Sequence, residues 1–454
     1  MLIVPLDPTF MSQSMPVIKE SGLLSTTLEM AKNPLAFIAK HTKAQGDTFM
    51  LDLRLSKLMV SSNPEVCRYV LQTHQKDFIK DKFYKKLKLA LGKGLLMNEG
   101  ESWKKQRKLA QPAFYKKRLD QLFDVMADIA IDYADELATR KQTGDYFNIT
   151  TDVFRITSDV VMQTLLGVGD MQSNKEIQDI IAETQDYIID RIRKPFLTVF
   201  AKLSGRHRRV MKRMHEFDQR IFEIIESRAG QTEPSNDLLA MLMDARDEHG
   251  EPMSRQQLRD EVITIYVAGH ETSANALSWT IMQLCQNPAV KAQLIQEIRQ
   301  QLQGRKPNLE DIKAMPYLMQ VIQESMRLYP PAWSVSRECT VNAEIAGHPV
   351  TAGQVIFLSI HALHRHPDLW ESPEAFKPER FSPEKVKARP NHYYIPFGAG
   401  PRMCIGNHFA MMEIAIILAA IFDRYDFELD PTNQVEMVPL VTLQPKPGIR
   451  VKVL

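Results

Sequence analysis

Apolar side chains recur at spacings of three and four residues over about three hundred residues that begin at Pro64. This spacing places apolar side chains on one face of an α-helix, which packs that face against a neighbour. The pattern predicts helices over residues 121–141, 175–190, 208–228, 254–285 and 288–303. In the fourth range, Ser254 followed by Gln257 resembles a capping box, and the helix of about thirty residues is long enough to cross a domain.

Strand patterns are few. Residues 47–61 partly alternate apolar with polar side chains and predict a short hairpin, and strand-like pieces return only at 350–359 and 448–454. The proline-rich stretch 367–390 predicts irregular structure. The chain shows no internal repeat or low-complexity linker. We therefore expect a mainly α fold with a minor β region, forming a single domain over residues 1–454 with a small N-terminal β region at about 45–62.

Membrane segments are not predicted. The longest wholly apolar run is residues 414–422, nine residues, whereas a membrane span needs about 20. The first ten residues are interrupted by Pro5 and Pro8 and show neither a basic start nor a small-residue cleavage site. We expect no transmembrane anchor and a cytoplasmic location; whether Met1 or Met11 is the natural start stays open.

Composition narrows the function classes. The 454 residues include 57 Lys and Arg against 55 Asp and Glu, a formal charge of +2, which argues against a nucleic-acid partner. Apolar residues make up 44% and charged residues 25%, as in ordinary globular proteins. The four cysteines lie far apart without CxxC spacing, which argues against a disulfide scaffold or a structural zinc site.

The most informative segment is residues 397–406, FGAGPRMCIG. Two glycines permit a tight turn that presents Cys404 just before a helix expected from about residue 405 to 425. Backbone N–H groups and the helix dipole favour a thiolate at this position. With Phe397 as a flat wall and Arg402 to pair with carboxylates, the segment suits an iron porphyrin. An inert buried cysteine is the alternative, but it has no use for the glycines, Phe397 and Arg402.

Residues 397–406 match FxxGxRxCxG, the haem-binding motif of the cytochrome P450 superfamily, which the chain resembles from about Gly92 to its end. Four further segments fall in the order of the other motifs of that family: WKKQR at 103–107, AGHETS at 268–273, ESMR at 324–327 and PERF at 378–381. The wording of the motifs is closer to bacterial fatty-acid and alkane hydroxylases than to camphor-type enzymes. The resemblance implies a fold with haem between a long central helix and the helix after the cysteine loop.

The resemblance implies heme b (iron protoporphyrin IX) with Cys404 as the metal ligand and Gly406 closing the loop. It places Trp103 and Arg107, which share a helix face at i, i+4, on a haem propionate. Arg337 resembles, more weakly, a further propionate contact from a strand. The alternative for Trp103 and Arg107 is an ordinary amphipathic helix whose arginine reaches solvent.

The resemblance gives the long helix the oxygen chemistry. Ala268 and Gly269 lack bulk and would leave room for a diatomic molecule, while Thr272 would hydrogen-bond the oxygen substrate. Glu271 would belong to a proton relay, a kind of assistance that contributes about 10² to 10⁴ in rate. As an alternative, or in addition, Thr272 bonds the carbonyl four residues back and bends the helix. We assign His270 no metal role.

Glu324 and Arg327, at i, i+3, would form a buried network with Arg380, which the resemblance makes structural rather than catalytic. It also implies a pocket lined by Leu95, Leu96, Val267, Ala332, Trp333, Val335, Leu440 and Val441. These side chains are mostly apolar, so we expect a lipophilic substrate such as a fatty acid, alkane or terpenoid. Each of them fits a plain core equally well.

No flavin or nicotinamide motif follows Cys404. Electrons from NAD(P)H would therefore come through a separate ferredoxin or flavodoxin with its reductase, which could dock at Lys104, Lys105 and Lys108. Together these features predict a haem-thiolate monooxygenase that inserts one atom of O2 into its substrate. The alternatives are a peroxide-driven peroxygenase or an isomerase, and a non-enzymatic haem sensor.

Overall fold

The computed structural model describes residues 15–19, 25–53, 57–167, 205–229 and 237–454, with positions 180, 183, 184 and 187. The chain divides into two compact units, each built from several segments. Unit 1 holds Met1–Asp81, Trp333–Pro373 and Pro390–Met403, and unit 2 holds Lys82–Ala332, Glu374–Arg389 and Cys404–Leu454. The organisation as a single domain stays a prediction. The expected helix 175–190 lies largely outside the described residues.

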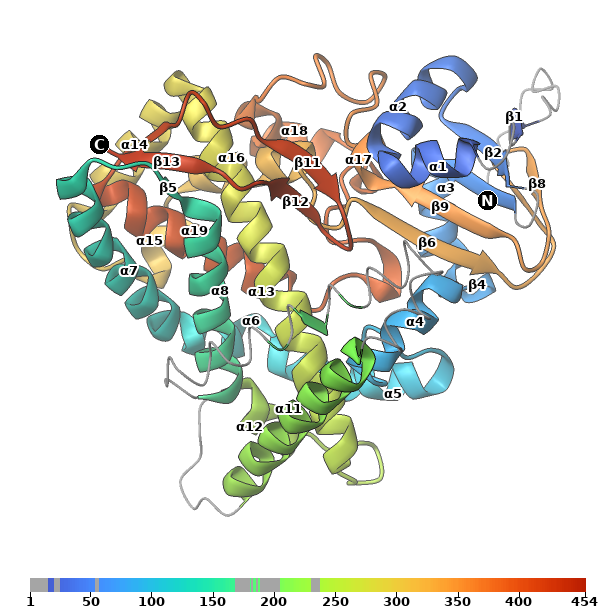
Figure 1. The fold of residues 1–454 in the computed structure, drawn as a ribbon, viewed down its shortest axis with the longest axis horizontal. Helices are drawn as coiled ribbons and strands as arrows, with labels where there is room; N and C mark the ends of the chain where they lie inside the picture. The colour runs from blue at the N-terminus through green and yellow to red at the C-terminus, as the bar shows by residue number, and fades with distance from the viewer. Residues whose placement is uncertain are drawn as a thin grey trace. The chain divides into compact units, whose positions relative to one another are not determined.

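Unit 1 contains a mixed six-stranded sheet with the order β1-β2-β3-β9-β6-β4 (Figure 1). The predicted hairpin is confirmed, because β2 and β3 pair antiparallel with Thr48 opposite Ser61. The predicted strand 350–359 is instead the end of one strand and the whole of another, separated by a turn. The strands are β1 Val17–Lys19, β2 Thr48–Asp52, β3 Lys57–Ser61, β4 Phe78–Ile79, β6 Ser334–Cys339, β7 Ala343–Ile345, β8 His348–Val350 and β9 Val355–Ser359; the helices are α1 Ser25–Lys32, α2 Pro34–Gln45, α3 Pro64–Arg68 and α17 Ile360–Leu363.

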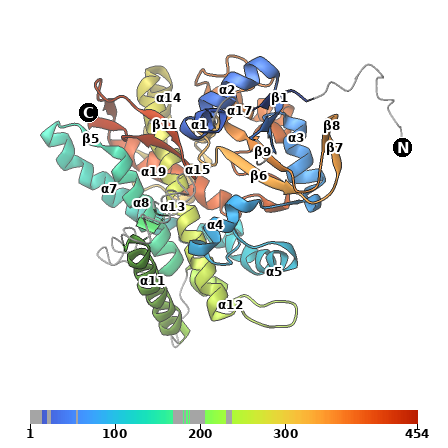
Figure 2. The same cartoon turned by 45° about the vertical axis from the view of Figure 1, so that its right-hand side comes forward.

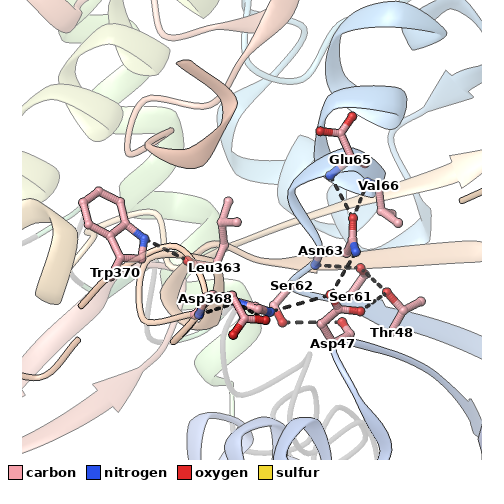
Figure 3. A network of polar contacts seen from close by, with 11 residues as sticks. Asp47, Thr48, Ser61, Ser62, Asn63, Glu65, Val66, Leu363, Asp368 and Trp370 are labelled. Atoms are coloured by element: carbon pink, nitrogen blue, oxygen red, sulfur yellow. Dashed lines mark hydrogen bonds and ion pairs between the residues drawn. The ribbon is translucent and has the colours of Figure 1, made fainter. Parts of the chain in front are cut away.

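A polar network fixes the end of the β2–β3 hairpin in unit 1 (Figure 3). The side chain of Asn63 caps α3 by accepting hydrogen bonds from the backbone N–H groups of Glu65 at 2.8 Å and Val66 at 3.1 Å. Its amide group donates to Asp47 at 2.8 Å. The hydroxyl groups of Thr48 and Ser61 bond at 2.8 Å across the pair of strands. These hydrogen bonds join the sheet to α3, because Asn63 caps this helix and also donates to Asp47, the residue just before β2.

Unit 2 is helical and is organised around α13, Arg255–Gln286, which packs against α8, α11, α16 and α19 (Figures 1 and 2). The prediction of a long helix over 254–285 is confirmed, and the hydroxyl of Ser254 accepts the backbone N–H of Gln257 at 3.2 Å. The other helices are α4 Lys82–Leu91, α5 Gly100–Ala110, α6 Lys116–Leu119, α7 Phe123–Thr143, α8 Ile149–Leu166, α11 Arg206–Ala229, α12 Leu238–Asp244, α14 Pro288–Leu302, α15 Leu309–Lys313, α16 Pro316–Leu328, α18 Pro383–Ala388 and α19 Asn407–Arg424.

Two small sheets complete unit 2. Strands β5 Phe147–Asn148, β13 Arg450–Val453 and β10 Phe427–Leu429 form one of them, and β11 Glu436–Pro439 pairs antiparallel with β12 Leu443–Lys446 in the other. The mainly helical class with a minor β region is thus confirmed. No helix within the described ranges is long and apolar enough to cross a bilayer.

Candidate functional site

Cys404 lies three residues before the start of α19, close to where the sequence pattern expected the helix to begin. Its side chain is exposed, yet burial of the sulfur raises the pKa of the thiol. The backbone N–H of Gly406 and the charge of Arg107 act in the opposite direction and lower that pKa. The residue therefore has accessible surface although protein surrounds its thiol. In the chain alone, burial outweighs the local features expected to favour a thiolate.

Helix α5 brings a cation and an indole toward Cys404. Trp103 and Arg107 stand one turn apart on this helix, Trp103 buried and Arg107 half-buried. Burial lowers the pKa of Arg107, while the charge of Cys404 raises it. A half-buried guanidinium next to an indole N–H suits a carboxylate, because the cation pairs with the charge and the indole donates a hydrogen bond.

The middle of α13 has an accessible face in an otherwise buried helix. Ala268 is exposed and Thr272, one turn further on, is half-buried. Tyr266 and His270, on the other faces, are buried. The hydroxyl of Thr272 donates to the carbonyl of Ala268 at 2.7 Å. The bond expected of a threonine within a helix is therefore present, and it holds the hydroxyl at the same face as Ala268.

Gly269 lies against the neighbouring helix α8. A side chain added at this position would meet Val161 of α8 at 3.2 Å, so Gly269 faces the neighbouring helix rather than the accessible face of α13. Its lack of a side chain lets α13 and α8 pack closely. Room for a diatomic molecule at Ala268 and Gly269 stays a prediction, and of the two only Ala268 is an exposed position.

Glu271 is buried and its carboxylate accepts hydrogen bonds from two residues that the sequence did not single out. The hydroxyl of Thr442 donates to it, and so does the amide of Gln444, at 2.8 Å. Asn275 donates to Thr442 at 3.1 Å. These bonds fasten the β11–β12 hairpin to α13. The proton-relay role of Glu271 stays a prediction, and the structure adds a positioning role for its carboxylate.

A second acid in this region was also missed. Glu413 on α19 is fully buried and faces Ser273 of α13, the neighbour of Thr272 in the chain. Burial raises its pKa to about 8, and the hydroxyl of Ser273 partly opposes that shift. No sequence pattern identifies a single glutamate in an apolar stretch of a helix, because only the packing of α19 on α13 brings Glu413 to Ser273.

Glu324, Arg327 and Arg380 come together in one buried cluster. The guanidinium of Arg327 donates to the carboxylate of Glu324 at 2.7 and 2.8 Å, and Arg380 donates to it at 3.3 Å. The backbone N–H of Lys377 adds a bond at 2.9 Å. The network joins α16 to the PERF turn, residues Pro378–Phe381, so removing Glu324 would take the shared acceptor from two buried guanidinium groups.

Residues expected in the substrate pocket divide between the units. In unit 2, the exposed fractions of Leu96 and Val441 are 40% and 44%, and Ala332 is also exposed. Leu95, Val267 and Leu440 are half-buried. In unit 1, Trp333 is buried, with its ring centroid 5.7 Å from that of Phe357, and Val335 packs against the core of the unit. The core alternative thus fits Trp333 and Val335 better than the unit 2 residues.

Three residues expected to contact a cofactor belong to unit 1. Arg337 of β6 is half-buried and its guanidinium donates to the carbonyl of Ser336 at 2.8 Å. Phe397 and Arg402 are also half-buried. Between them, Gly400 adopts φ +68° with its backbone against the carbonyl of Leu71, so no other residue fits there. Contact of Arg337, Phe397 and Arg402 with a cofactor stays a prediction.

The family is shown by comparison with known proteins. The model of the family described as "Cytochrome P450" matches residues 19–453 of the chain. The chain therefore belongs to the cytochrome P450 family and is a cytochrome P450 monooxygenase, an oxidoreductase class that includes hydroxylases.

Similar proteins come from bacteria, plants and animals. The chain is 32% identical to cyclooctat-9-en-7-ol 5-monooxygenase of Streptomyces melanosporofaciens, covering 89% of this chain and 87% of that protein. It is 31% identical to cytochrome P450 4V2 of Mus musculus, covering 88% and 82%. It is also 31% identical to cytokinin hydroxylase of Arabidopsis thaliana, covering 79% and 71%.

Solved structures support the fold. The crystal structure of the cytochrome P450DA heme domain matches with a TM-score of 0.86 at 22% identity, covering 97% of this chain and 98% of that chain. The cytochrome P450 CYP102L1 matches with a TM-score of 0.85 at 25% identity, covering 97% and 100%.

The family implies haem, and the residues of unit 2 fit that group. Cys404 is an exposed residue with a free thiol, Arg107 offers a cation for a carboxylate, and Ala268 is an exposed position on a largely buried helix. A thiolate is a known ligand of haem iron. The donor set and the accessible surface therefore agree with the cofactor that the family implies.

Proposed function

We propose that the protein binds heme b, iron protoporphyrin IX, through the sulfur of Cys404 and hydroxylates a lipophilic small molecule with one atom of O2. When bound, the haem supplies the activation of oxygen. The observation that carries the proposal is that Cys404 is an exposed residue whose thiol is surrounded by protein and lies near the cation of Arg107. Trp103 and Arg107 would meet a propionate.

The residues of α13 would handle oxygen and protons. Ala268 leaves space at the accessible face, and the Thr272 hydroxyl, held by the Ala268 carbonyl, is placed at the same face. Glu271 would accept and release a proton through its contacts with Thr442 and Gln444. A positioned acid with access to a chain of polar groups is what such proton transfer needs.

We infer a lipophilic substrate, such as a fatty acid, an alkane or a terpenoid. Apolar side chains remain exposed on two separate loops of unit 2, at Leu96 and Val441, and a ligand that covered them would remove apolar surface from water. One relative is named for the 5-monooxygenation of cyclooctat-9-en-7-ol and another for hydroxylation of a cytokinin. Those names support hydroxylation of small organic molecules in general.

Electrons would come from NAD(P)H through a ferredoxin or flavodoxin and its reductase. The competing activities are a peroxide-driven peroxygenase and an isomerase, which often dispense with the acid and alcohol pair that this chain keeps at Glu271 and Thr272. Turnover with a reductase system against turnover with peroxide separates them. A non-enzymatic haem sensor would give neither.

The test is haem binding with a matched cysteine control. The protein is produced with iron and a haem precursor, reduced and exposed to carbon monoxide. We expect the Soret band that is characteristic of thiolate ligation, and its loss in Cys404→Ser. Cys285→Ser, which removes a thiol that bonds the carbonyl of Phe427, should keep the band. A colourless protein, or a band retained in Cys404→Ser, would contradict the proposal.

A further inference from the structure

The loop of residues 92–98, which connects α4 to α5, is held on α13 by two consecutive carboxylates. The backbone N–H of Lys93 donates to Asp260 at 2.8 Å, and the backbone N–H of Leu95 donates to Glu261 at 2.9 Å. Both acids are buried, with exposed fractions of 5% and 1%. Two buried acceptors that hold backbone N–H groups two residues apart attach the loop to α13.

Two glycines let the backbone of the loop lie directly on the helix. A side chain carbon at Gly94 would come within 2.0 Å of the Thr264 hydroxyl and 2.5 Å of the Asp260 carbonyl. At Gly92, with φ +63°, it would come within 2.3 Å of the Asp260 carboxylate. These distances exclude any side chain at either position. The contact of the loop with α13 therefore requires both glycines, in addition to any requirement of the turn itself.

The contact lies at one end of the accessible face of α13. Thr264, Ala268 and Thr272 follow one another at intervals of four residues and share a face of the helix. Thr264 is buried beneath Gly94, whereas Ala268 is exposed. One turn of helix, about 6 Å along the axis, therefore separates the covered part of this face from its open part.

The side chains that follow Gly94 are apolar. Leu95 is half-buried and Leu96 has an exposed fraction of 40%. Because the two carboxylates hold the N–H groups on either side of Gly94, they fix where these leucines begin. The figures place α4, at the start of this loop, alongside the same part of α13 (Figures 1 and 2).

Other helices of unit 2 support the same junction. The guanidinium of Arg259 donates to Asp260 at 2.7 Å and to Asp218 of α11 at 2.8 Å. From α5, the side chain amide of Gln106 donates to the carbonyl of Lys93 at 2.8 Å. The loop is thus fastened by α5 and α13 directly and by α11 through Arg259.

Hydrogen bonds offset the burial of Glu261 only in part. One of its carboxylate oxygens accepts from Leu95, and the other has no hydrogen-bond partner within the described part of the chain. Burial, and then the charge of Asp260, raise its pKa to about 7. A buried acid with an unsatisfied oxygen is unfavourable by itself. Within the described residues, the hydrogen bond that its carboxylate accepts is the one from the Leu95 N–H of the loop.

We propose that Asp260 and Glu261 are positioning residues for ligand specificity: they hold the loop of residues 92–98 at the end of the accessible face of α13, so that Leu95 and Leu96 contact the apolar tail of a ligand that extends beyond Ala268. The proposal rests on the proposed function, because that function supplies the ligand. It predicts that the attachment does not change the affinity for small ligands that bind only the iron. The affinity for ligands with a long apolar tail should depend on it.

Amide hydrogen exchange of the full-length protein as purified tests the attachment directly, since the readout does not need haem. Glu261→Leu removes the acceptor for the Leu95 N–H, and we expect exchange of the 92–98 segment to rise about tenfold, as for loss of one hydrogen bond of this kind. Glu261→Gln keeps an oxygen acceptor and should remain near the wild-type rate. Unchanged exchange in Glu261→Leu would overturn the proposal.

An optical titration tests the link to ligand size. Imidazole occupies only the iron, whereas 1-dodecylimidazole adds a long apolar tail. We expect Glu261→Leu to weaken the binding of 1-dodecylimidazole about tenfold while imidazole binds as before, with Glu261→Gln close to wild type. Equal effects on both azoles, or none on either, would overturn the proposal.

Gly94→Ala gives a second route to the same result without touching a carboxylate. The added carbon has no space against Thr264, so the loop must lift, and both the faster exchange and the loss of selectivity for the long azole are expected. If Gly94→Ala changes neither, the proposal fails. A protein that binds no haem would fail the azole titration in every variant, and the exchange measurement would still report on the attachment, which separates the two failures.

Discussion

Glu413 shows how burial decides the chemistry of a single residue in this fold. Its carboxyl group is fully buried on α19 and faces the hydroxyl of Ser273. Burial raises its pKa from the ordinary 4.5 to about 8, so the group is neutral near pH 7. A neutral acid facing Ser273 can donate a hydrogen bond, which a charged one cannot.

The raised pKa predicts a specific dependence of stability on pH. Between about pH 4.5 and about pH 8 the folded protein keeps a proton on Glu413 that the unfolded chain has released. The free energy of unfolding must therefore fall as pH rises through this window, by up to about 1.4 kcal/mol per pH unit. Glu413→Gln removes this contribution, and urea unfolding at a series of pH values should show a shallower fall than in the wild type.

Exposed Glu436 provides the control, because Glu436→Gln should keep the wild-type dependence. The difference between Glu413→Gln and the wild type should be small near pH 4 and grow toward alkaline pH. A wild-type slope in Glu413→Gln would mean that this carboxyl does not change its protonation on unfolding.

The sequence could identify residues whose partners are close along the chain or lie in a spaced motif. Cys404 stands out through the glycines and Arg402 around it, and Glu324 and Arg327 through their spacing on one helix face. Glu261 and Thr442 could not be identified in this way. Their partners, Leu95 and Glu271, are 166 and 171 residues away along the chain, so only tertiary packing makes these side chains neighbours.

At the scale of elements, α13 and α8 pack closely because Gly269, and not its neighbour Ala268, faces α8. Ala268 and Gly269 are adjacent, yet a helix turns by about 100° between them. Ala268 lies on the accessible face, and Gly269 lies against Val161. A motif in which both are small does not reveal this division, because periodicity over two residues cannot assign a face.

Gly269→Val should therefore destabilise the protein more than Ala268→Val does. The added carbon meets Val161 at 3.2 Å, and overpacking of this kind typically costs about 1–3 kcal/mol. Ala268→Val adds the same side chain on the accessible face, where only helix propensity opposes it, by about 0.5 kcal/mol. Chemical unfolding of the two variants measures the difference.

A double-mutant cycle locates the effect at the helix contact. Val161→Ala makes space opposite Gly269, so the combined variant should be more stable than the sum of the two single changes requires, by about 1 kcal/mol. Strict additivity would show that Gly269 does not pack against Val161.

For the whole molecule, 57 basic and 55 acidic residues nearly balance, so the net charge attracts a charged partner only weakly. Electrostatic attraction must therefore come from local clusters of charge. The lysines proposed to receive a redox partner illustrate this. Lys104 is paired with Glu101, Lys105 with Asp247 at 2.6 Å and Lys108 with Glu248 at 3.0 Å. The cluster is thus less positive than the lysines alone suggested. Exposed pairs are weak, about 0–1 kcal/mol, so an acidic partner could still exchange places with these carboxylates.

Reversal of the three charges tests whether this surface receives electrons. In Lys104→Glu, Lys105→Glu, Lys108→Glu, reduction by a ferredoxin system should slow about tenfold at low ionic strength and approach the wild-type rate as salt screens the interaction. Peroxide-supported turnover bypasses the partner and should not change. The matched control reverses Lys212, Lys306 and Lys313, which are also paired with carboxylates of the same unit. If both triple variants slow reduction equally, the partner docks elsewhere, because only a local contact makes one set of charges matter more than the other. A parallel fall in peroxide-supported turnover would also contradict docking at this surface.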